Sequence, residues 1–313
     1  MISYILRRLA ATIPVMLIVA VLVFLMLRLT PSDPAAIIAG DNATSEQILA
    51  IRAKLGLDQP IVTQFFTWLG RVLSGDFGNS FFFKKTVWEL VSNRIEPTLS
   101  LSALTMVFAI AIAVPLGAIA AYRQGTLIDR VVMGFSVLGF SVPVFVIGYV
   151  LVYVFAINLG WFPVQGYQRL ASGIGPWLQS LILPAVTLSV IYIALIARMT
   201  RTSMLDVLSE DYIRTARAKG QTEAKVLFRH ALKNAAVPIV TVVGIGIALL
   251  IGGVVVTESV YSIPGLGRLT VDAVLARDFP VIQAIILLFS LVYVLINLIV
   301  DLSYTIFDPR IRH

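Results

Sequence analysis

Six long apolar stretches constrain the fold of this sequence more than any other feature. They cover residues 9–29, 98–121, 131–157, 178–200, 236–257 and 281–306. A run of roughly 20 predominantly apolar residues can cross the hydrocarbon core of a bilayer as a helix, which satisfies its own backbone hydrogen bonds. The sequence therefore predicts an all-α integral membrane protein with six transmembrane helices.

The composition supports a membrane protein. Hydrophobic residues make up 58% of the 313 residues and charged residues only 13%, whereas soluble domains are about 45–50% apolar and about 25% charged. This excess is too large for one compact soluble core. The chain has no cysteine, which excludes disulfides, Cys-ligated zinc and Cys nucleophiles.

The distribution of Lys and Arg predicts the orientation of the spans. Arg7 and Arg8 precede the first span, which is too long for the core of a signal peptide and is expected to stay uncleaved. Eight Lys and Arg residues lie between residues 198 and 235, while the two short loops on the other side hold only Arg169, Arg268 and Arg277. Because basic residues favour the cytoplasmic side, both termini are predicted to be cytoplasmic.

This topology divides the chain into residues 1–29, the N-terminal tail and first span; 30–97, a large extracytoplasmic loop; and 98–313, a five-span core. Within the large loop, residues 45–55 read as a short helix with Ser45 as its N-cap and Gly56 as its stop. A second helix is expected over residues 60–73, followed by a turn at 75–80.

The cytoplasmic loop 198–235 is the most informative segment. Residues 203–219 fit one amphipathic helix, and Gly220 fits the position after its end, where glycine adopts a left-handed conformation cheaply. Thr222 is then expected to cap a second helix over residues 223–233. Together they predict two short helices around a tight turn.

Three interpretations of this loop stay open on composition. Juxtamembrane bases often lie on anionic lipid. A helix-turn-helix reader of DNA has a similar outline, although tethering to a membrane argues against it. The third is a rigid bent helix that docks into a cleft on a cytoplasmic protein, which the mixture of eight basic and four acidic residues favours.

The motif in this loop resembles that of binding-protein-dependent ABC importer permeases. The family pattern is Glu-Ala-Ala, three residues, Gly, and later Ile-x-Leu-Pro; the run Asp211 to Gly220 is similar to its peptide-permease form. The chain keeps three of the pattern's residues, Ala216, Gly220 and Leu232. It departs from the general pattern at Arg214, Thr215, His230 and Lys233.

Other short motifs extend the resemblance to the B subunits of oligopeptide, dipeptide, nickel and glutathione-like permeases. Their order and spacing carry the assignment, since each is weak alone. They are Arg7-Arg8-Leu9, Pro31-Ser32-Asp33-Pro34, Gly75-Asp76-Phe77-Gly78, Leu159-Gly160-Trp161-Phe162-Pro163, residues 263–268, residues 277–283 and Asp308-Pro309-Arg310-Ile311-Arg312.

The resemblance implies a transport subunit of the bacterial inner membrane that is not itself an enzyme. Its expected partners are a second related permease chain, two ATP-binding subunits, an extracytoplasmic substrate-binding protein and membrane lipid, with no nucleic acid. ATP and Mg would be bound by the partner subunits, and this chain has no Gly-x-x-x-x-Gly-Lys-Ser/Thr phosphate loop. The resemblance assigns docking on the ATPase to Asp211, Tyr212, Arg214, Thr215, Ala216, Arg217 and Gly220.

Polar residues within or beside the spans are the remaining candidates, because ionisable groups at membrane depth are often functional. Glu258, at the outer end of the fifth span, is a candidate for the outer gate or for contact with the binding protein, together with Pro264, Gly265 and Arg268. A solvated carboxylate at the interface is an equally good interpretation of Glu258. Neither a catalytic residue nor a metal site is predicted, and the substrate stays open.

Two rival functions predict features that are hard to find here. An ion-coupled secondary transporter would place carboxylates at the bilayer midplane within an inverted repeat. An intramembrane protease would need a nucleophile and base at helix depth, but His230 lies in the cytoplasmic loop and His313 is the last residue.

Overall fold

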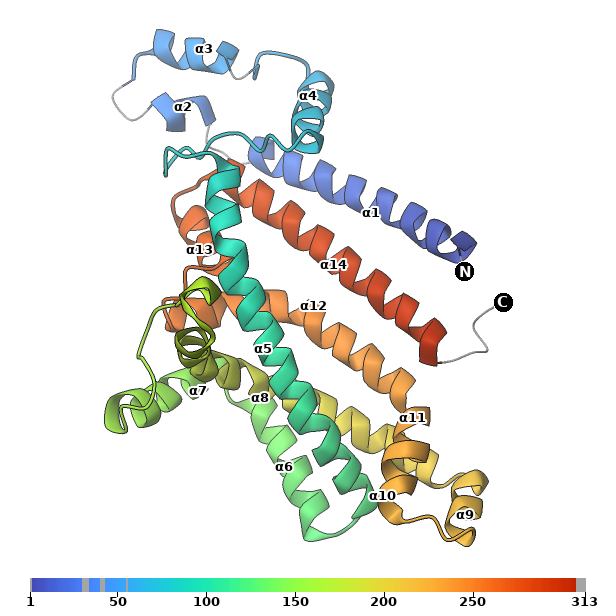
Figure 1. The fold of residues 1–313 in the computed structure, drawn as a ribbon. Helices are drawn as coiled ribbons and strands as arrows, with labels where there is room; N and C mark the ends of the chain where they lie inside the picture. The colour runs from blue at the N-terminus through green and yellow to red at the C-terminus, as the bar shows by residue number, and fades with distance from the viewer. Residues whose placement is uncertain (1, 30–33, 40–42, 55, 308–313) are drawn as a thin grey trace. The chain divides into compact units, whose positions relative to one another are not determined.

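The computed structural model describes residues 2–29, 34–39, 43–54 and 56–307. Within these ranges the chain is helical and contains no β-strand (Figure 1), which confirms the predicted all-α class. The long helices are α1 (Ile2–Leu29), α5 (Val87–Tyr122), α6 (Leu127–Ser141), α8 (Ile174–Leu208), α12 (Ala236–Val260) and α14 (Phe279–Phe307). The shorter ones include α2 (Pro34–Ala39), α3 (Ser45–Lys54), α4 (Ile61–Leu73), α7 (Val144–Leu151) and α13 (Leu266–Leu275).

Four helices are long and apolar enough to cross a membrane, and each coincides with a predicted span. They are Val87–Tyr122, Ile174–Leu208, Ala236–Val260 and Phe279–Ser303. The bent pair Leu127–Ser141 and Val144–Asn158 makes a fifth if it counts as one span. In α1 the apolar segment Ala10–Met26 is shorter. The described residues thus contain four or five candidate spans by length and composition.

The predicted span over residues 131–157 is broken near its middle, where α6 and α7 meet at an angle of 103°. Val142 has an extended backbone with φ −92° and ψ 124°, and Pro143 begins the next helix. Proline disfavours the helical conformation in the residue before it and lacks an N–H to continue the hydrogen-bond ladder. The end of this pair, Val152–Asn158, continues as a π-helix.

The chain packs as two compact units. Among the described residues, the bundle unit comprises 95–268 and 295–307, and the N-terminal unit comprises those within 2–94 and 269–294. The N-terminal unit therefore combines segments from the two ends of the sequence.

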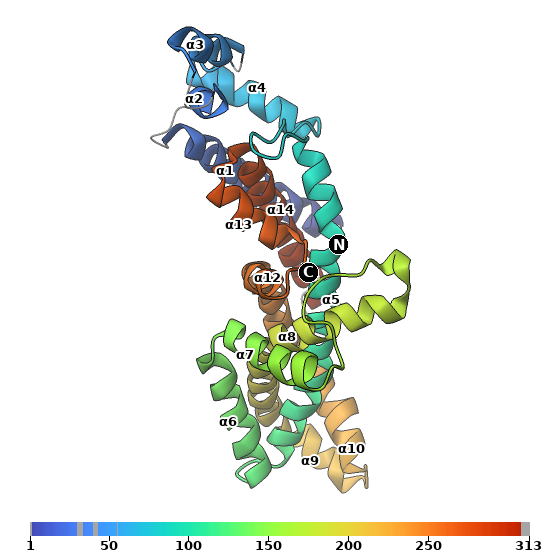
Figure 2. The same ribbon diagram turned by 90° about the vertical axis from the view of Figure 1, so that its left-hand side faces the viewer.

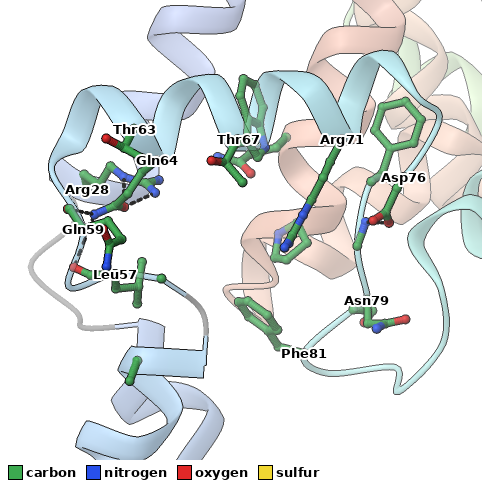
Figure 3. A pocket seen from close by; sticks show the side chains of 18 residues that line it. Arg28, Leu57, Gln59, Thr63, Gln64, Thr67, Arg71, Asp76, Asn79 and Phe81 are labelled. Carbon is green, nitrogen blue, oxygen red and sulfur yellow. Dashed lines mark hydrogen bonds between the residues drawn. The ribbon is translucent and has the colours of Figure 1, made fainter.

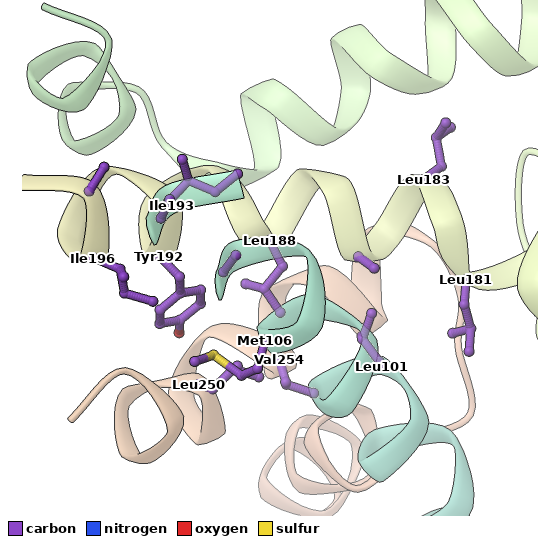
Figure 4. Close-up of a cluster of buried hydrophobic side chains, with 14 of the residues drawn as sticks. Leu101, Met106, Leu181, Leu183, Leu188, Tyr192, Ile193, Ile196, Leu250 and Val254 are labelled. Atoms are coloured by element: carbon purple, nitrogen blue, oxygen red, sulfur yellow. The ribbon is translucent and has the colours of Figure 1, made fainter. Parts of the chain in front are cut away.

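Helix α8 forms the centre of the bundle unit, and 72% of its 18-residue apolar stretch is buried. Leu188, Tyr192 and Ile196 of α8 contribute to a core shared with α5 and α12 (Figure 4). Glycine allows α5 to approach α8 closely: a Cβ atom on Gly117 would lie 2.6 Å from Cβ of Thr200. Movement of α8 therefore requires its neighbours to move or repack.

In the N-terminal unit, α4 packs against α1 and the beginning of α14. Ala20 and Val23 of α1 and Leu287 of α14 are buried beneath α4. The sequence correctly predicted a helix here and another at α3, but the N-cap of α3 is Thr44 rather than Ser45. Thr44 and Gln47 form a reciprocal capping box, in which each backbone N–H donates to the other's side chain at 2.9 and 3.3 Å.

Candidate functional site

The candidate site is the segment after α8, residues 209–235, termed here the coupling segment. It contains α9 (Asp211–Ala218), α10 (Glu223–Lys225), a π-helix over Val226–Ala231 and α11 (Leu232–Asn234). Figures 1 and 2 both place α9 and α10 at the end of the bundle unit where the short loop between α5 and α6 also lies.

The predicted single helix over residues 203–219 is wrong, because the chain breaks between α8 and α9. The backbone N–H groups of Ser209 and Glu210 donate to carbonyls three residues earlier, on Asp206 and Val207. The Ser209 hydroxyl also donates to the Asp206 carbonyl at 2.7 Å. Glu210 is then extended and serves as the N-cap position of α9. These local hydrogen bonds compete with continuation of the helix.

The predicted left-handed conformation of Gly220 is confirmed, with φ +74°. Its N–H donates to the Arg217 carbonyl at 2.9 Å, and the Gln221 N–H donates to the Ala216 carbonyl at 3.2 Å. This pair of bonds is a Schellman motif. A Cβ atom at Gly220 would meet nothing within 4 Å, so a side chain there would strain the backbone rather than clash.

The second predicted helix, over residues 223–233, forms as three consecutive helical pieces. Thr222 occupies the N-cap position with an extended backbone, but its side chain makes no capping hydrogen bond. Val226, Leu227 and Ala231 of the π-helix are buried. The turn at Gly220 therefore folds this part of the coupling segment back against the bundle unit.

A small apolar cluster supports the coupling segment. Ile213 of α9 is fully buried with Val226 and Leu227, and Met204 of α8 and Ala118 of α5 belong to the same cluster. The single helix predicted over residues 203–219 would place Tyr212, rather than Ile213, on the same face as Met204 and Leu208. The break before α9 shifts the helical phase, and this shift accounts for the error. This packing makes the coupling segment a structured part of the bundle unit.

The opposite face of α9 presents polar groups to solvent. Arg214 donates to Asp211 at 3.2 Å, but their side chains are 74% and 94% exposed. Arg217 pairs with Glu223 at 3.0 Å across the turn. The Thr215 side chain is exposed, while Ala216 is half-buried. Exposed ion pairs contribute little to folding, so these groups are available to a partner.

Tyr212 bridges the two halves of the coupling segment. Its hydroxyl accepts a hydrogen bond of 2.7 Å from the Asn234 side chain, and the residue remains 41% exposed. Of the seven residues predicted to dock, the structure therefore brings six onto α9 and places Gly220 at the turn that ends it.

An ion pair missed by the sequence interpretation joins α6 to α8 beside the coupling segment. Asp129 accepts two hydrogen bonds from the Arg201 guanidinium, at 2.5 and 2.8 Å, and a third from the Gly125 N–H at 2.9 Å. The Asp129 side chain is 6% exposed. Asp129 lies in the first turn of α6 after a glycine turn, which is the sequence signal for an acid at a helix N-terminus.

At the other end of α12, Glu258 is fully buried, so the expectation of a solvated carboxylate is wrong. Its carboxylate accepts hydrogen bonds from the Thr98 hydroxyl at 2.5 Å and from the Arg268 N–H at 2.9 Å. A Cβ atom on Gly265 would lie 2.0 Å from Glu258 Oε1. The carboxylate therefore holds residues 261–268 against α5 and α12. These residues comprise the turn after α12 and the first residues of α13, and are called the loop 261–268 below; Pro264 is exposed on it.

A second carboxylate organises the loop between α7 and α8. Glu96 accepts hydrogen bonds from the Tyr167 hydroxyl at 3.0 Å and the Leu170 N–H at 2.9 Å. Burial, together with the negative charge of Glu96, raises the pKa of the Tyr167 phenol. Tyr167 therefore remains a proton donor to Glu96 at neutral pH.

In the N-terminal unit, Asp278 fixes the turn that follows the Gly-Asp-Phe-Gly motif. The Ser80 hydroxyl and the Phe81 and Phe82 N–H groups donate to the buried Asp278 carboxylate. A cavity of about 690 Å³ lies beside this turn (Figure 3), with Arg28 and Arg71 among its lining residues. Among the described residues, no group of His, Cys, Asp and Glu could hold a metal ion.

Some predicted features concern residues outside those described. Pro31, Ser32 and Asp33 of the second motif and the C-terminal motif Asp308–Arg312 fall in this category. Polar residues inside the spans bond mainly within their own helices: Ser136 donates to the Val132 carbonyl and Ser189 to the Val186 carbonyl.

The fold is similar to that of a solved ABC transporter. The MetNI methionine ABC transporter, solved in inward-facing conformations, shares this fold with a TM-score of 0.58 and 19% identity. The match covers 70% of this chain and 96% of that chain.

The chain belongs to the family described as binding-protein-dependent transport system inner membrane components. The main family model matches residues 113–313, and the model for the N-terminal part of such components matches residues 1–102. The protein is thus a permease subunit of an ABC importer and not itself an enzyme. Membership of this family decides against the ion-coupled transporter.

Relatives match over the whole chain. A probable peptide ABC transporter permease protein of Sinorhizobium fredii is 57% identical over 99% of both chains. A glutathione transport system permease protein of Salmonella choleraesuis is 46% identical over 100% of both chains. A peptide transport system permease protein of Brucella abortus is 47% identical over the same extent.

Proposed function

We propose that this chain is a permease subunit for the uptake of peptides or peptide-like small solutes across a bacterial inner membrane. It would form half of the translocation pore with a second, related permease chain. The full-length similarity to peptide and glutathione permeases supports this substrate class. A thermal-shift panel of peptides, glutathione and nickel chelates on the partner binding protein tests it; stabilisation only by non-peptide solutes would overturn it.

The proposed topology has six spans with both termini in the cytoplasm. Residues 10–26 of α1 would make the first span and the bent pair α6–α7 the third. The Lys and Arg residues of the coupling segment support its cytoplasmic position. Residues 30–97 and the loop 261–268 would then face the binding protein, with Pro264 and Arg268 at an outer gate positioned by Glu258 and Gly265.

The proposed mechanism begins at the solvent-exposed face of α9. Two partner subunits would bind ATP and Mg, and the exposed Asp211, Arg214 and Arg217 would dock on one of them. The observation that carries this proposal is the two-faced structure of α9. Ile213 is fully buried, while the side chains of Asp211 and Arg214 are 94% and 74% exposed. Because α9 is packed against the bundle unit on one face and exposed on the other, a movement of a bound ATPase subunit would displace α9 and, through this packing, α8.

Gly220→Asp tests this role. We expect uptake of labelled dipeptide to be lost while the protein remains in the membrane, because a side chain at φ +74° strains the turn that orients α9. Gly160→Asp is a matched control, since Gly160 has φ +65° and open space around its Cβ but lies in the loop between α7 and α8. Normal uptake by a well-expressed Gly220→Asp variant would overturn the proposal.

A further inference from the structure

Helix α4 has three distinct faces, although it is only 13 residues long. Its sequence, Ile61–Leu73, contains no acidic residue and one basic residue, Arg71. Positions four residues apart share a face of a helix. Two of the three faces have an evident role within the N-terminal unit, and the third does not.

The first face anchors α4 to α1. Trp68 and Val72 pack over the buried α1 residues Ala20 and Val23. The ring of Phe65 lies 5.2 Å from that of Phe24 in an edge-to-face arrangement. The position of α4 along α1 is therefore set by aromatic packing.

A hydrogen bond fixes the depth of this contact. The Arg28 guanidinium donates to the Gln64 side chain at 2.6 Å. Arg28 comes two residues after the end of the apolar segment Ala10–Met26. A basic residue just beyond an apolar span is typical of the level of the lipid headgroups. The contact with Gln64 places α4 at the same level.

The second face is polar and lines the cavity of the N-terminal unit. Thr63, Thr67 and Arg71 follow one another at four-residue intervals and belong to the cavity wall (Figure 3). This face needs water or polar groups around it. It therefore also defines which side of α4 cannot face hydrocarbon.

The third face is the apolar stripe formed by Val62, Phe66 and Leu73. These side chains are 62%, 65% and 79% exposed. Leu69, between them on the same face, is half-buried against the anchoring cluster. Three large apolar side chains on one short helix are a continuous water-exposed surface that a soluble environment would disfavour.

We propose that the apolar stripe of α4 lies in the outer interfacial layer of the bilayer, so that α4 is a membrane-surface helix beside the first span. Helix α1, on which α4 packs, also exposes large apolar side chains, with Ile18 60% and Leu22 62% exposed. The absence of acidic residues suits contact with anionic lipid, and an amphipathic helix at headgroup depth inserts its apolar face among the acyl chains.

Single-cysteine labelling tests this placement directly, because the chain contains no cysteine. Phe66→Cys and Leu73→Cys carry an environment-sensitive fluorophore on the stripe, and Thr67→Cys carries it on the polar face of the same helix. The assembled transporter is placed in nanodiscs containing brominated lipid, and quenching by lipid is compared with quenching by aqueous iodide. Labelled variants are first checked for retained uptake.

We expect brominated lipid to quench labels at Phe66→Cys and Leu73→Cys about threefold more than at Thr67→Cys, with the order reversed for iodide. Equal access of iodide to all three positions would overturn the proposal. So would labels that escape lipid quenching and are shielded only when the binding protein is added, since the stripe would then be a protein contact. If Phe66→Cys fails to accumulate, Val62→Cys replaces it on the same stripe.

Discussion

The coupling segment and the loop 261–268 both belong to the bundle unit, but they differ in the burial of the charged side chains that they contact or contain. On α9, the Asp211 and Arg214 side chains pair at 3.2 Å yet are 94% and 74% exposed. Beneath the loop 261–268, Glu258 is 0% exposed and bonds to Thr98 and Arg268. The charged side chains of α9 are exposed to solvent, whereas the Glu258 carboxylate is buried among its hydrogen-bond partners.

The difference separates two roles that charge can have in a permease. An exposed ion pair is worth about 0–1 kcal/mol to folding, so selection for stability alone gives little reason to keep it. Removing a buried carboxylate leaves its hydrogen-bond donors without an acceptor. The folding free energy lost in this way is several times larger than that of an exposed ion pair. We therefore expect substitutions at Glu258 to affect folding and substitutions on the outer face of α9 to affect partner binding.

The largest effect is expected for Glu258→Ala. Thr98 and the Arg268 N–H would lose an acceptor in a buried site, which costs about 3 kcal/mol in the free energy of unfolding. The apparent melting temperature of the detergent-solubilised complex should fall, as measured by fluorescence-detected size-exclusion chromatography. Glu258→Gln keeps one acceptor oxygen and should lose less. If Glu258→Ala has the same apparent melting temperature as the parent protein, Glu258 does not stabilise the fold, and the expected difference between the two regions is wrong.

An intermediate effect is expected for Asp129→Asn, because the pair with Arg201 is mostly buried yet lies beside the coupling segment. Weakening this bidentate contact should cost about 2 kcal/mol and lower the amount of substrate imported per ATP hydrolysed in proteoliposomes. The exchanged double variant Asp129→Arg with Arg201→Asp should restore part of the import ratio. An unchanged ratio in Asp129→Asn would show that α6 and α8 need no ionic tie during transport.

The smallest effect on folding is expected for Arg214→Ala, within about 0.5 kcal/mol of the parent. Its effect should appear instead as weaker retention of the ATPase subunits by the permease in nanodiscs, measured by biolayer interferometry. Arg169→Ala, an exposed arginine in the loop between α7 and α8, is the matched control and should retain them normally. If Arg214→Ala melts early while retaining the ATPases, α9 is a structural element and the comparison fails.

Apolar length and glycine chemistry were predictable from the sequence. Four of the six predicted spans coincide with long apolar helices, because hydropathy over some 20 residues is a strong signal. Gly220 was also located correctly, since its left-handed conformation is a local property of the turn. Such features depend on a few neighbouring residues and need no knowledge of tertiary packing.

The breaks and buried polar contacts were not predictable in the same way. Neither Val142 nor Ser209 carries a signal that distinguishes a broken helix from a kinked one. Proline at 115 and 184 sits inside continuous helices, whereas Pro143 begins a new one. Ile213 was missed because the break before α9 changes its phase, and the partners of Glu258 lie 160 and 10 residues away in the sequence.

The length of α8 has a mechanical consequence. Its 35 residues span about 52 Å, whereas the hydrocarbon core is about 30 Å thick. In the proposed topology, about 20 Å of α8 would therefore extend beyond the lipid. A rod held at its middle by packing acts as a lever arm, so a tilt of about 10° would move its tip by roughly 4 Å. A small displacement of α9 would thus be transmitted along α8 to its far end, while the helix stays intact.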